Sequence, residues 1–390
     1  FSLYSGPQTV IVLNDIDVVN EALLKKGSHY SDRVQMFTSM FKFDIIFGQF
    51  GSGWKLRRKL ASRAIRLFMS TDNFNHKLEE AVTKTIEAML KEKGAFNPKP
   101  YLFYATLNII AAMCFGKSYD FDDPEYWELL NLLERNAEVQ NENLVLENVF
   151  PYFAGIYKTK RCRDAEGIMN RFMSYVERHV NEHRAKFVPG EVHDLTDSLL
   201  QSEIELTEEG KDDMANFKPI HVQLIVFDVF LAGNDTSRST LLWMLMFIIG
   251  TPGVQQKIHQ EIDKVVGHDR YPTTQDRSNL PYLDAVLHES MRLGPVVPLG
   301  VPHSTSCDTT IGKYDVPKGT FIFINHYALH LNPDHWPEVN KFKPERYLDD
   351  DGKMAPKPDY WLPFSAGRRV CVGEPMAKSE LHLVMAGLFQ

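Results

Sequence analysis

The sequence predicts a mainly α-helical protein with a small β part, and three observations support this fold class. Apolar residues recur at three-to-four spacing over most of residues 28–295, as they do on one face of an amphipathic helix. Runs rich in β-prone residues are short and lie at the beginning of the chain and near residues 320–325. The chain contains no internal repeat, low-complexity tract or clear linker, so we expect a single domain over residues 1–390.

The individual elements follow in chain order from local signals. Residues 1–4 and 9–13 are β-prone runs separated by turn-forming residues, which predicts a hairpin. Asp15 is expected to cap a helix that runs to Lys26 and stops at Gly27. Further helices are expected over residues 54–68, 74–93, 100–115, 163–187 and 219–250 and from Pro375 onward, whereas residues 341–364 predict a long ordered loop.

Composition and charge narrow the function classes. The chain of 390 residues carries 51 acidic and 43 basic residues, hence a net charge of −8, and 44% of its residues are hydrophobic. These values exclude a disordered chain, and the acidic surplus argues against a nucleic-acid partner bound mainly by charge. Four cysteines in a chain of this length favour a reducing environment over a disulfide framework.

Both ends of the chain look incomplete. The first residue already lies in a strand-like run, and Gln390 lies inside an apolar helical pattern without a Gly or Pro stop. No uncharged apolar run reaches the ~20 residues that a membrane-spanning helix needs. We therefore expect a domain that is truncated at both ends.

One long helix is expected over Pro219–Gly250, roughly 48 Å at 1.5 Å per residue. It is apolar nearly all round, as expected for a helix that crosses the middle of a large domain. Its centre, residues 232–237 (Ala-Gly-Asn-Asp-Thr-Ser), contains residues that disfavour helix. This segment is either a kink with solvent-facing polar side chains or a functional site. At such a site Gly233 would leave room for a ligand, and Asp235 beside Thr236 would supply and position a proton.

A cysteine stands in a glycine-rich loop just before the expected C-terminal helix. The loop reads Phe364-Ser365-Ala366-Gly367-Arg368-Arg369-Val370-Cys371-Val372-Gly373. The positive end of the helix dipole and the two arginines favour a thiolate at Cys371. Such a thiolate would be a nucleophile or a metal ligand, and a plain buried cysteine is the alternative.

The loop fits the pattern F-x-x-G-x-R-x-C-x-G, which fixes five positions and has a chance below roughly one in ten thousand in such a chain. This pattern is the haem-binding signature of the cytochrome P-450 family, which the chain resembles from end to end. Three more segments match family motifs in order: residues 232–237, Glu289-Ser290-Met291-Arg292 and Pro344-Glu345-Arg346-Tyr347. The resemblance is strongest to the animal microsomal branch that includes steroid 17α-hydroxylases and drug-metabolising enzymes. It implies a P-450 fold with the long central helix over a haem.

The resemblance also implies roles for individual residues. Cys371 would be the axial thiolate ligand of the iron of haem b, with Phe364 and Gly367 shaping the loop beneath it. Asp235 and Thr236 would relay protons to the distal oxygen. Residues that match propionate contacts are Trp54, Arg58, His303 and Arg369. Many relatives carry a further propionate-binding arginine before Trp54, where this chain has Phe41-Lys42-Phe43, and Lys42 is at best a weak substitute.

The implied activity is that of a haem-thiolate monooxygenase acting in a single catalytic domain. It would insert one oxygen atom from O2 into a lipophilic substrate such as a steroid, fatty acid or xenobiotic. NADPH–cytochrome reductase would supply the electrons, with cytochrome b5 as a second candidate donor. The basic stretch over residues 54–66, together with Arg368 and Lys378, would dock the acidic donor. Relatives are anchored in the endoplasmic reticulum membrane on its cytosolic face, so we expect a membrane-attached parent protein.

Two other function classes remain as alternatives. A haem-binding carrier or sensor without monooxygenase activity would need Cys371 but not the acid–alcohol pair at residues 235–236. A zinc hydrolase is the other alternative: His288-Glu289 begins an H-E-x-x-H motif, but Arg292 stands at its last position, so the second histidine ligand is missing. His326, His330 and His335 form a second histidine group that favours zinc only weakly.

Overall fold

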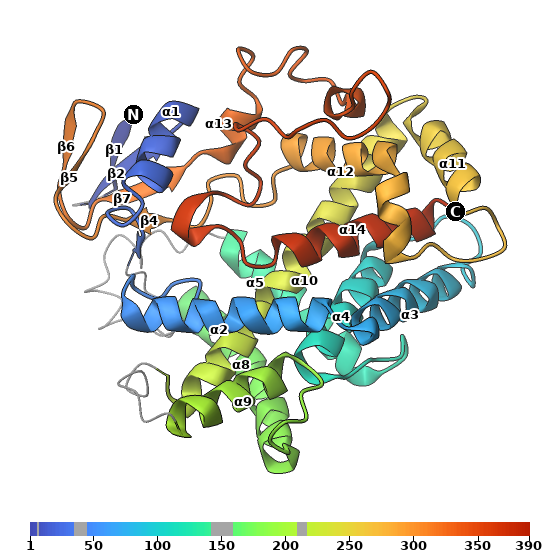
Figure 1. Cartoon of the computed structure of the whole chain (residues 1–390), viewed down its shortest axis with the longest axis horizontal. Coiled ribbons are helices and arrows are strands. Elements are labelled where there is room, and N and C mark those ends of the chain that lie inside the picture. The colour runs from blue at the N-terminus through green and yellow to red at the C-terminus, as the bar shows by residue number, and fades with distance from the viewer. Residues whose placement is uncertain (6–7, 35–44, 142–158, 209–216) are drawn as a thin grey trace.

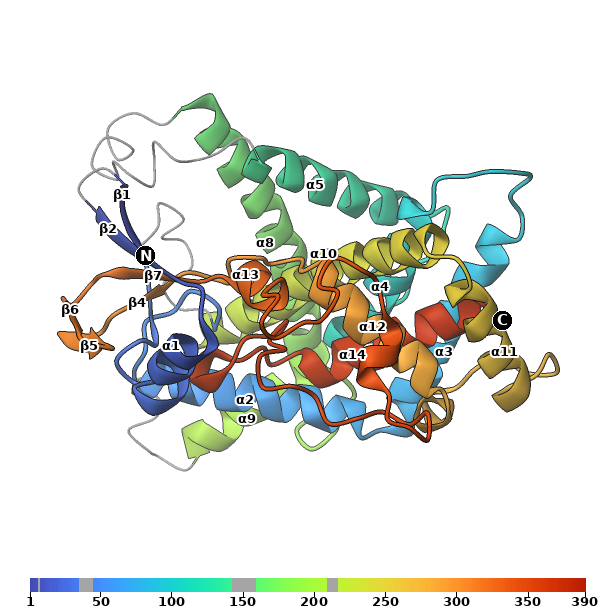
Figure 2. The ribbon, with the colours of Figure 1, turned by 90° about the horizontal axis from the view of Figure 1, so that it is seen from above.

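The computed structural model describes residues 1–5, 8–34, 45–141, 159–208 and 217–390. Helices make up most of the molecule, and the strands gather at one edge of it beside the N-terminus (Figures 1 and 2). This arrangement confirms the predicted mainly α class with a small β part. Among the described residues, no helix combines the length and the apolar composition that crossing a membrane requires.

The main sheet has five strands in the order β1-β2-β7-β4-β3. The strands are β1 (Ser2–Ser5), β2 (Gln8–Leu13), β3 (Asp32–Arg33), β4 (His303–Ser304) and β7 (Phe321–Ile324), and β5 (Thr309–Ile311) pairs with β6 (Tyr314–Val316) in a second sheet. The antiparallel pairing of β1 with β2 confirms the predicted hairpin. In addition, β2 runs parallel to β7, and β3 pairs with β4 so that Arg33 lies opposite His303. The sheet thus joins the first 35 residues to the region after residue 300.

The predicted helices are present with small shifts at their ends. Asp15 caps α1 (Ile16–Asn20) by accepting a hydrogen bond from the Asp17 N–H at 2.9 Å, and the helix continues as the π-helix η1 (Glu21–Lys25). The following helices are α2 (Ser52–Met69), α3 (Asp72–Met89), α4 (Lys99–Phe115), α5 (Pro124–Asn141), α8 (Lys160–Lys186) and α9 (Leu195–Glu208). Thr71 and Thr159 cap α3 and α8, since each side chain accepts a backbone N–H of the first turn.

The second half of the chain contains the long central helix and the helices around it. They are α10 (Pro219–Gly250), α11 (Val254–Val265), α12 (Pro281–Leu293), α13 (His326–His330) and α14 (Glu374–Leu388), with short 3₁₀ turns η4 (Thr274–Asn279), η5 (Pro344–Tyr347) and η6 (Gly367–Arg369). The bounds of α10 agree with the prediction. The expected loop over residues 341–364 contains η5 and a bridge between Leu348 and Met354.

Helix α10 crosses the middle of the molecule and packs along α4 (Figure 2). At Gly233 the two helices approach so closely that a Cβ there would lie 2.4 Å from Cδ1 of Ile110. Gly233 therefore serves helix packing. The expectation that Gly233 also leaves room for a ligand stays a prediction, because this close approach concerns only the side on which a Cβ would project.

A buried ion cluster ties α12 to the loop that follows α13. Glu289 and Arg292 are both 0% exposed, and the Arg292 guanidinium donates to the two Glu289 oxygens at 2.7 and 2.8 Å. Arg346 of η5 donates to the same carboxylate at 3.1 Å, so the two motifs meet in one Glu–Arg–Arg cluster. Arg292 also donates to the carbonyls of His330 and Val339, so its donors bind groups from three segments.

Candidate functional site

The cysteine loop lies against the first helical segment of the chain. The Cys371 N–H donates to the Phe364 carbonyl at 3.0 Å, which closes the loop just before α14. Gly367 has φ +72°, and a Cβ there would lie 2.3 Å from the Leu23 carbonyl oxygen of η1. Only glycine fits this left-handed position and this close backbone approach, so the signature glycine has a physical reason in this fold.

Cys371 is the one exposed cysteine, whereas Cys114 and Cys162 are buried and Cys307 is half-buried. Desolvation by the surrounding loop raises the pKa of the Cys371 thiol. The N–H groups of Gly373 and Glu374 and the Arg58 guanidinium pull that pKa down but do not compensate. The helix end therefore does not make a thiolate by itself, contrary to the expectation. A bound metal ion would, because a coordinating thiol loses its proton.

Three of the predicted cofactor-binding residues gather beside this loop. The Trp54 indole N–H donates to the Ile45 carbonyl at 3.0 Å, and the Arg369 guanidinium lies 3.9 Å from the centre of the Trp54 ring. Arg58, one turn further along α2, lies 5.5 Å from that ring and donates to the Val370 carbonyl. Arg369 donates to the carbonyls of Ser31, Ile45 and Gly48. Trp54, Arg58 and Arg369 thus form one cationic group, in which Trp54 and Arg369 are buried and Arg58 is half-buried.

His303 extends this group toward the sheet. Its Nδ1 lies 2.7 Å from the Tyr30 carbonyl, which can only accept, so Nδ1 carries a proton and Nε2 is left to meet a ligand. Burial, then the charges of Arg33 and Arg369, lower the pKa of His303 well below its usual value. This corner of the molecule is therefore electropositive, and an anionic group bound here would be stabilised.

A further buried cation, Arg33, lies opposite His303 in the sheet. Arg33 is 6% exposed and donates to the carbonyls of Ile46 at 2.9 Å and Val301 at 2.8 Å. The expected substitute at Lys42, with its neighbours Phe41 and Phe43, lies outside the described residues. The sequence signal was weak, because Arg33 belongs to a two-residue strand whose pairing with β4 spans about 270 residues.

The polar segment of α10 faces the cysteine loop across a small cavity. The cavity holds about 50 Å³ and is lined on one side by Thr236, Ser237 and Thr240 and on the other by Phe364 and Val296, among others. The Thr236 hydroxyl donates to the Ala232 carbonyl at 2.7 Å. The Asp235 side chain is 46% exposed and pairs with Arg238 at 2.9 Å. The acid and the alcohol are thus neighbours in sequence but bind different partners.

The predicted donor-docking patch is smaller than the sequence suggested. Lys55, Lys59 and Arg368 are exposed. Arg57 is only 6% exposed, and Lys378 is 8% exposed and pairs with Glu374 of its own helix. Arg57 and Lys378 therefore do not belong to an exposed docking surface, because helix packing turns them inward.

The histidines of the zinc alternative are used in packing. The His288 ring stacks on Trp361 at 4.5 Å, and its Nδ1 faces the Asp284 carbonyl. His330 Nε2 accepts the Leu362 N–H at 3.0 Å, and His335 stacks on Tyr360. Within the described ranges these histidines do not form a metal-ligand group, so the structure gives the zinc hydrolase no site there.

Comparisons with known proteins agree with this geometry. The family model described as "Cytochrome P450" matches residues 1–390. The chain is 35% identical to "Cytochrome P450 2U1" of Bos taurus, covering 100% of this chain and 72% of the relative. It is 32% identical to "Steroid 17-alpha-hydroxylase/17,20 lyase" of Squalus acanthias, covering 100% and 78%. A solved structure titled "Zebra fish cytochrome P450 another structure with Progesterone" superimposes with a TM-score of 0.87 at 31% identity, covering 99% of this chain and 87% of the other.

The shared fold and the cysteine loop imply a haem cofactor. The donor set fits one, with an exposed cysteine on the loop before α14 and a mostly buried cationic group beside it. The chain therefore belongs to the cytochrome P-450 family and, like its animal microsomal relatives, is a haem-thiolate monooxygenase that receives electrons from a reductase.

Proposed function

We propose that the chain binds haem b, with Cys371 as the iron ligand, and oxidises a lipophilic substrate next to the polar segment of α10. The observation that carries this proposal is the placement of Cys371. Its side chain is the exposed one of the four cysteines, and its loop faces Thr236 and Ser237. When bound, the haem supplies O2 activation and oxygen transfer to the substrate.

The chain's cationic corner would hold the two propionates of haem b. Arg58 and Arg369 donate to backbone carbonyls on either side of Trp54, and His303 keeps Nε2 directed to a ligand because Nδ1 is bonded to Tyr30. A propionate beside Nε2 would favour the protonated form of His303, since an opposite charge stabilises the charged form. Arg33 would support the same corner from the neighbouring strand, since it lies opposite His303.

The α10 pair would handle protons. Asp235 is 46% exposed and can exchange protons with water. The Thr236 hydroxyl lines the cavity and would turn from the Ala232 carbonyl to pass a proton toward the reacting oxygen. A carrier or sensor would bind haem through Cys371 without using these two side chains, and the family relationship does not favour that alternative.

Substrate and partners follow from the relatives. One relative is a steroid 17-alpha-hydroxylase/17,20 lyase, and one structural neighbour has progesterone in its title, so a steroid is the substrate class we favour. NADPH–cytochrome reductase, with cytochrome b5 as a second donor, would dock on the exposed basic residues Lys55, Lys59 and Arg368. We place the parent protein on the cytosolic face of the endoplasmic reticulum membrane.

The test is the absorption spectrum of the reduced, carbon-monoxide-bound protein. We expect a red-shifted Soret band in the wild type that is lost in Cys371→Ala and kept in Cys307→Ala, a matched control at a half-buried cysteine. An imidazole-type spectrum in the wild type, or a red-shifted band that survives Cys371→Ala, would refute thiolate ligation by this residue.

A further inference from the structure

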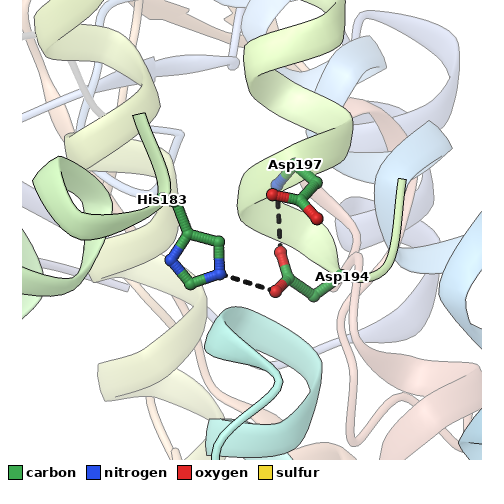
Figure 3. A group of neighbouring side chains, drawn as sticks. All are labelled: His183, Asp194 and Asp197. Atoms are coloured by element: carbon green, nitrogen blue, oxygen red, sulfur yellow. Dashed lines mark hydrogen bonds and ion pairs between the residues drawn. The ribbon is translucent and has the colours of Figure 1, made fainter. Parts of the chain in front are cut away.

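Three potential metal ligands meet where α8 ends and α9 begins (Figure 3). His183 lies in the last turn of α8, Asp194 just before α9 and Asp197 in the first turn of α9. One ligand atom from each residue lies within 4.8 Å of the others. This is the one such group among the residues that the structure describes, and the haem-dependent reaction does not use it.

Local hydrogen bonds orient each of the three side chains. Asp194 accepts the Asp197 N–H at 2.9 Å, as an N-terminal cap does. Asp197 in turn accepts the His193 N–H at 3.1 Å. The two aspartates are 5% and 7% exposed and so are held in place by the fold. The site is thus preformed by the start of α9.

His183 has the orientation that metal-binding histidines commonly adopt. Its Nδ1 lies 2.9 Å from the His179 carbonyl, which can only accept, so Nδ1 carries a proton. Its Nε2 points at Asp194 Oδ2, 2.7 Å away (Figure 3). A backbone carbonyl bound to one ring nitrogen fixes the tautomer and leaves the other nitrogen for a metal ion.

The group holds two carboxylates and one histidine, so one carboxylate has no countercharge within the group itself. Nearby, Lys117 and Arg178 share the single carboxylate of Glu125, and Arg184 pairs with Glu203. A divalent ion could replace the proton that His183 and Asp194 share. The net charge of the ion, the two carboxylates and neutral His183 would then be zero.

A second observation points to a ligand at this place. His179, one turn before His183, has an 8% exposed side chain. Its buried Nε2 finds no hydrogen-bond partner within the described part of the chain. His179 and the three ligands line the same open cavity of about 640 Å³. The cavity gives an ion and its water access to the site, and His179 Nε2 is a partner for such a water.

We propose that His183, Asp194 and Asp197 form a zinc site that links α8 to α9. His183 Nε2 and one oxygen from each aspartate would be the ligands, with water in the fourth position. Zn²⁺ would displace the Nε2 proton, which leaves to solvent. The Nε2–Oδ2 separation would open from 2.7 Å to roughly 3.3 Å, as tetrahedral coordination requires. Bound zinc would stabilise the folded protein through mass action.

The test titrates the tag-free, haem-loaded protein with ZnCl2 by isothermal calorimetry. We expect one zinc ion per chain, and at least about a tenfold loss of affinity in Asp197→Asn, since even outer-shell partners contribute 10–100-fold. His268→Gln is the matched control, because His268 pairs with Asp263 at 3.4 Å on the surface without a third ligand. Its zinc affinity should equal that of the wild type.

X-ray absorption at the zinc edge then identifies the ligands. We expect nitrogen and oxygen neighbours near 2.0–2.2 Å only. A sulfur neighbour, unchanged zinc affinity in Asp197→Asn, or absence of binding in the wild type would overturn the proposal. The carbon-monoxide spectrum verifies that each variant is folded and haem-loaded. If Asp197→Asn fails that check, His183→Gln takes its place with the same expected loss.

Discussion

Two glutamates lie deep in this protein in opposite surroundings. Glu289 of α12 is 0% exposed and Glu380 of α14 is 1% exposed. Glu289 accepts hydrogen bonds from Arg292 and Arg346. Glu380 accepts one, from the Ser237 hydroxyl at 3.2 Å, and its Oε1 has no partner among the described residues. Burial is the same for both, so the partners decide which charge state the fold tolerates.

As a consequence, Glu380 keeps its proton at neutral pH. Desolvation raises the pKa of Glu380 to about 8, and the hydrogen bond from Ser237 offsets only part of that rise. At Glu289 the guanidinium groups replace the water that a carboxylate loses on burial. The haem-side core is therefore held by an ionic cluster, whereas the contact between α14 and α10 contains a neutral acid.

Breaking the ionic cluster should have the largest effect. Glu289→Gln leaves the 0% exposed Arg292 without its countercharge, which costs about 3–5 kcal/mol in comparable buried pairs. We expect a much lower yield of haem-loaded protein and a lower urea midpoint of unfolding. Glu338→Gln is the control, since exposed Glu338 pairs with Lys341 and Lys343 and should change little. Equal midpoints for both variants would contradict the comparison.

Because Glu380 is buried as a neutral acid, we predict that the free energy of unfolding decreases as the pH rises. Folded Glu380 holds its proton up to about pH 8, whereas in the unfolded chain it is released near its ordinary value. The free energy of unfolding therefore falls as the pH rises from about 4.5, and it levels off above pH 8. The decrease is about 1.4 kcal/mol per pH unit, which amounts to on the order of 3 kcal/mol by pH 7.

Glu380→Gln isolates this contribution, because glutamine is similar in shape and cannot ionise. Urea unfolding of both proteins from pH 5 to 8.5 should show that the free energy of unfolding falls less steeply in the variant. Parallel curves would mean that Glu380 is not buried as a neutral acid. The sign is opposite to that of an ion-paired carboxylate, which gains stability as pH rises.

The smallest expected effect is that of Ser237→Ala. Removing one neutral hydrogen bond in a buried site costs about 1 kcal/mol. It also removes the group that lowers the pKa of Glu380. The pH above which the free energy of unfolding becomes constant should therefore be higher in this variant. Ser202→Ala is the control, since buried Ser202 donates only within its own helix. A shift of the pH profile in Ser202→Ala but not in Ser237→Ala would refute the assignment of Ser237 as the partner.

Most predictions from local signals were confirmed, and several that depended on which elements pack together were not. The Asp15 cap, the bounds of α10 and the position of the cysteine loop before α14 follow from a few neighbouring residues. The close approach of Gly233 to Ile110 was not predicted. Arg57 was expected on an exposed surface but is buried. Each of these outcomes depends on which helix packs against which.

The same difference between local and tertiary signals applies to Cys371. Its place in the loop was predicted from the sequence, but the helix end does not lower the pKa of the thiol as expected, because loop packing desolvates the sulfur more than the helix end and Arg58 compensate. The position of Arg33 beside His303 was not predicted, because its partner strand lies about 270 residues away. Such pairings have no local signal, since side chains distant in sequence meet only after the chain has folded.

The sequence by itself determined the helical class, the order of the helices and the cysteine signature, because helix periodicity, caps and turns are properties of short segments. The tertiary structure alone decided which charges are compensated: Glu289 by two arginines, Glu380 by a single hydroxyl, and His183 by an aspartate eleven residues away. The physical reason is that the free energy of a buried charge depends on the groups within a few ångströms of it, whatever their distance along the chain.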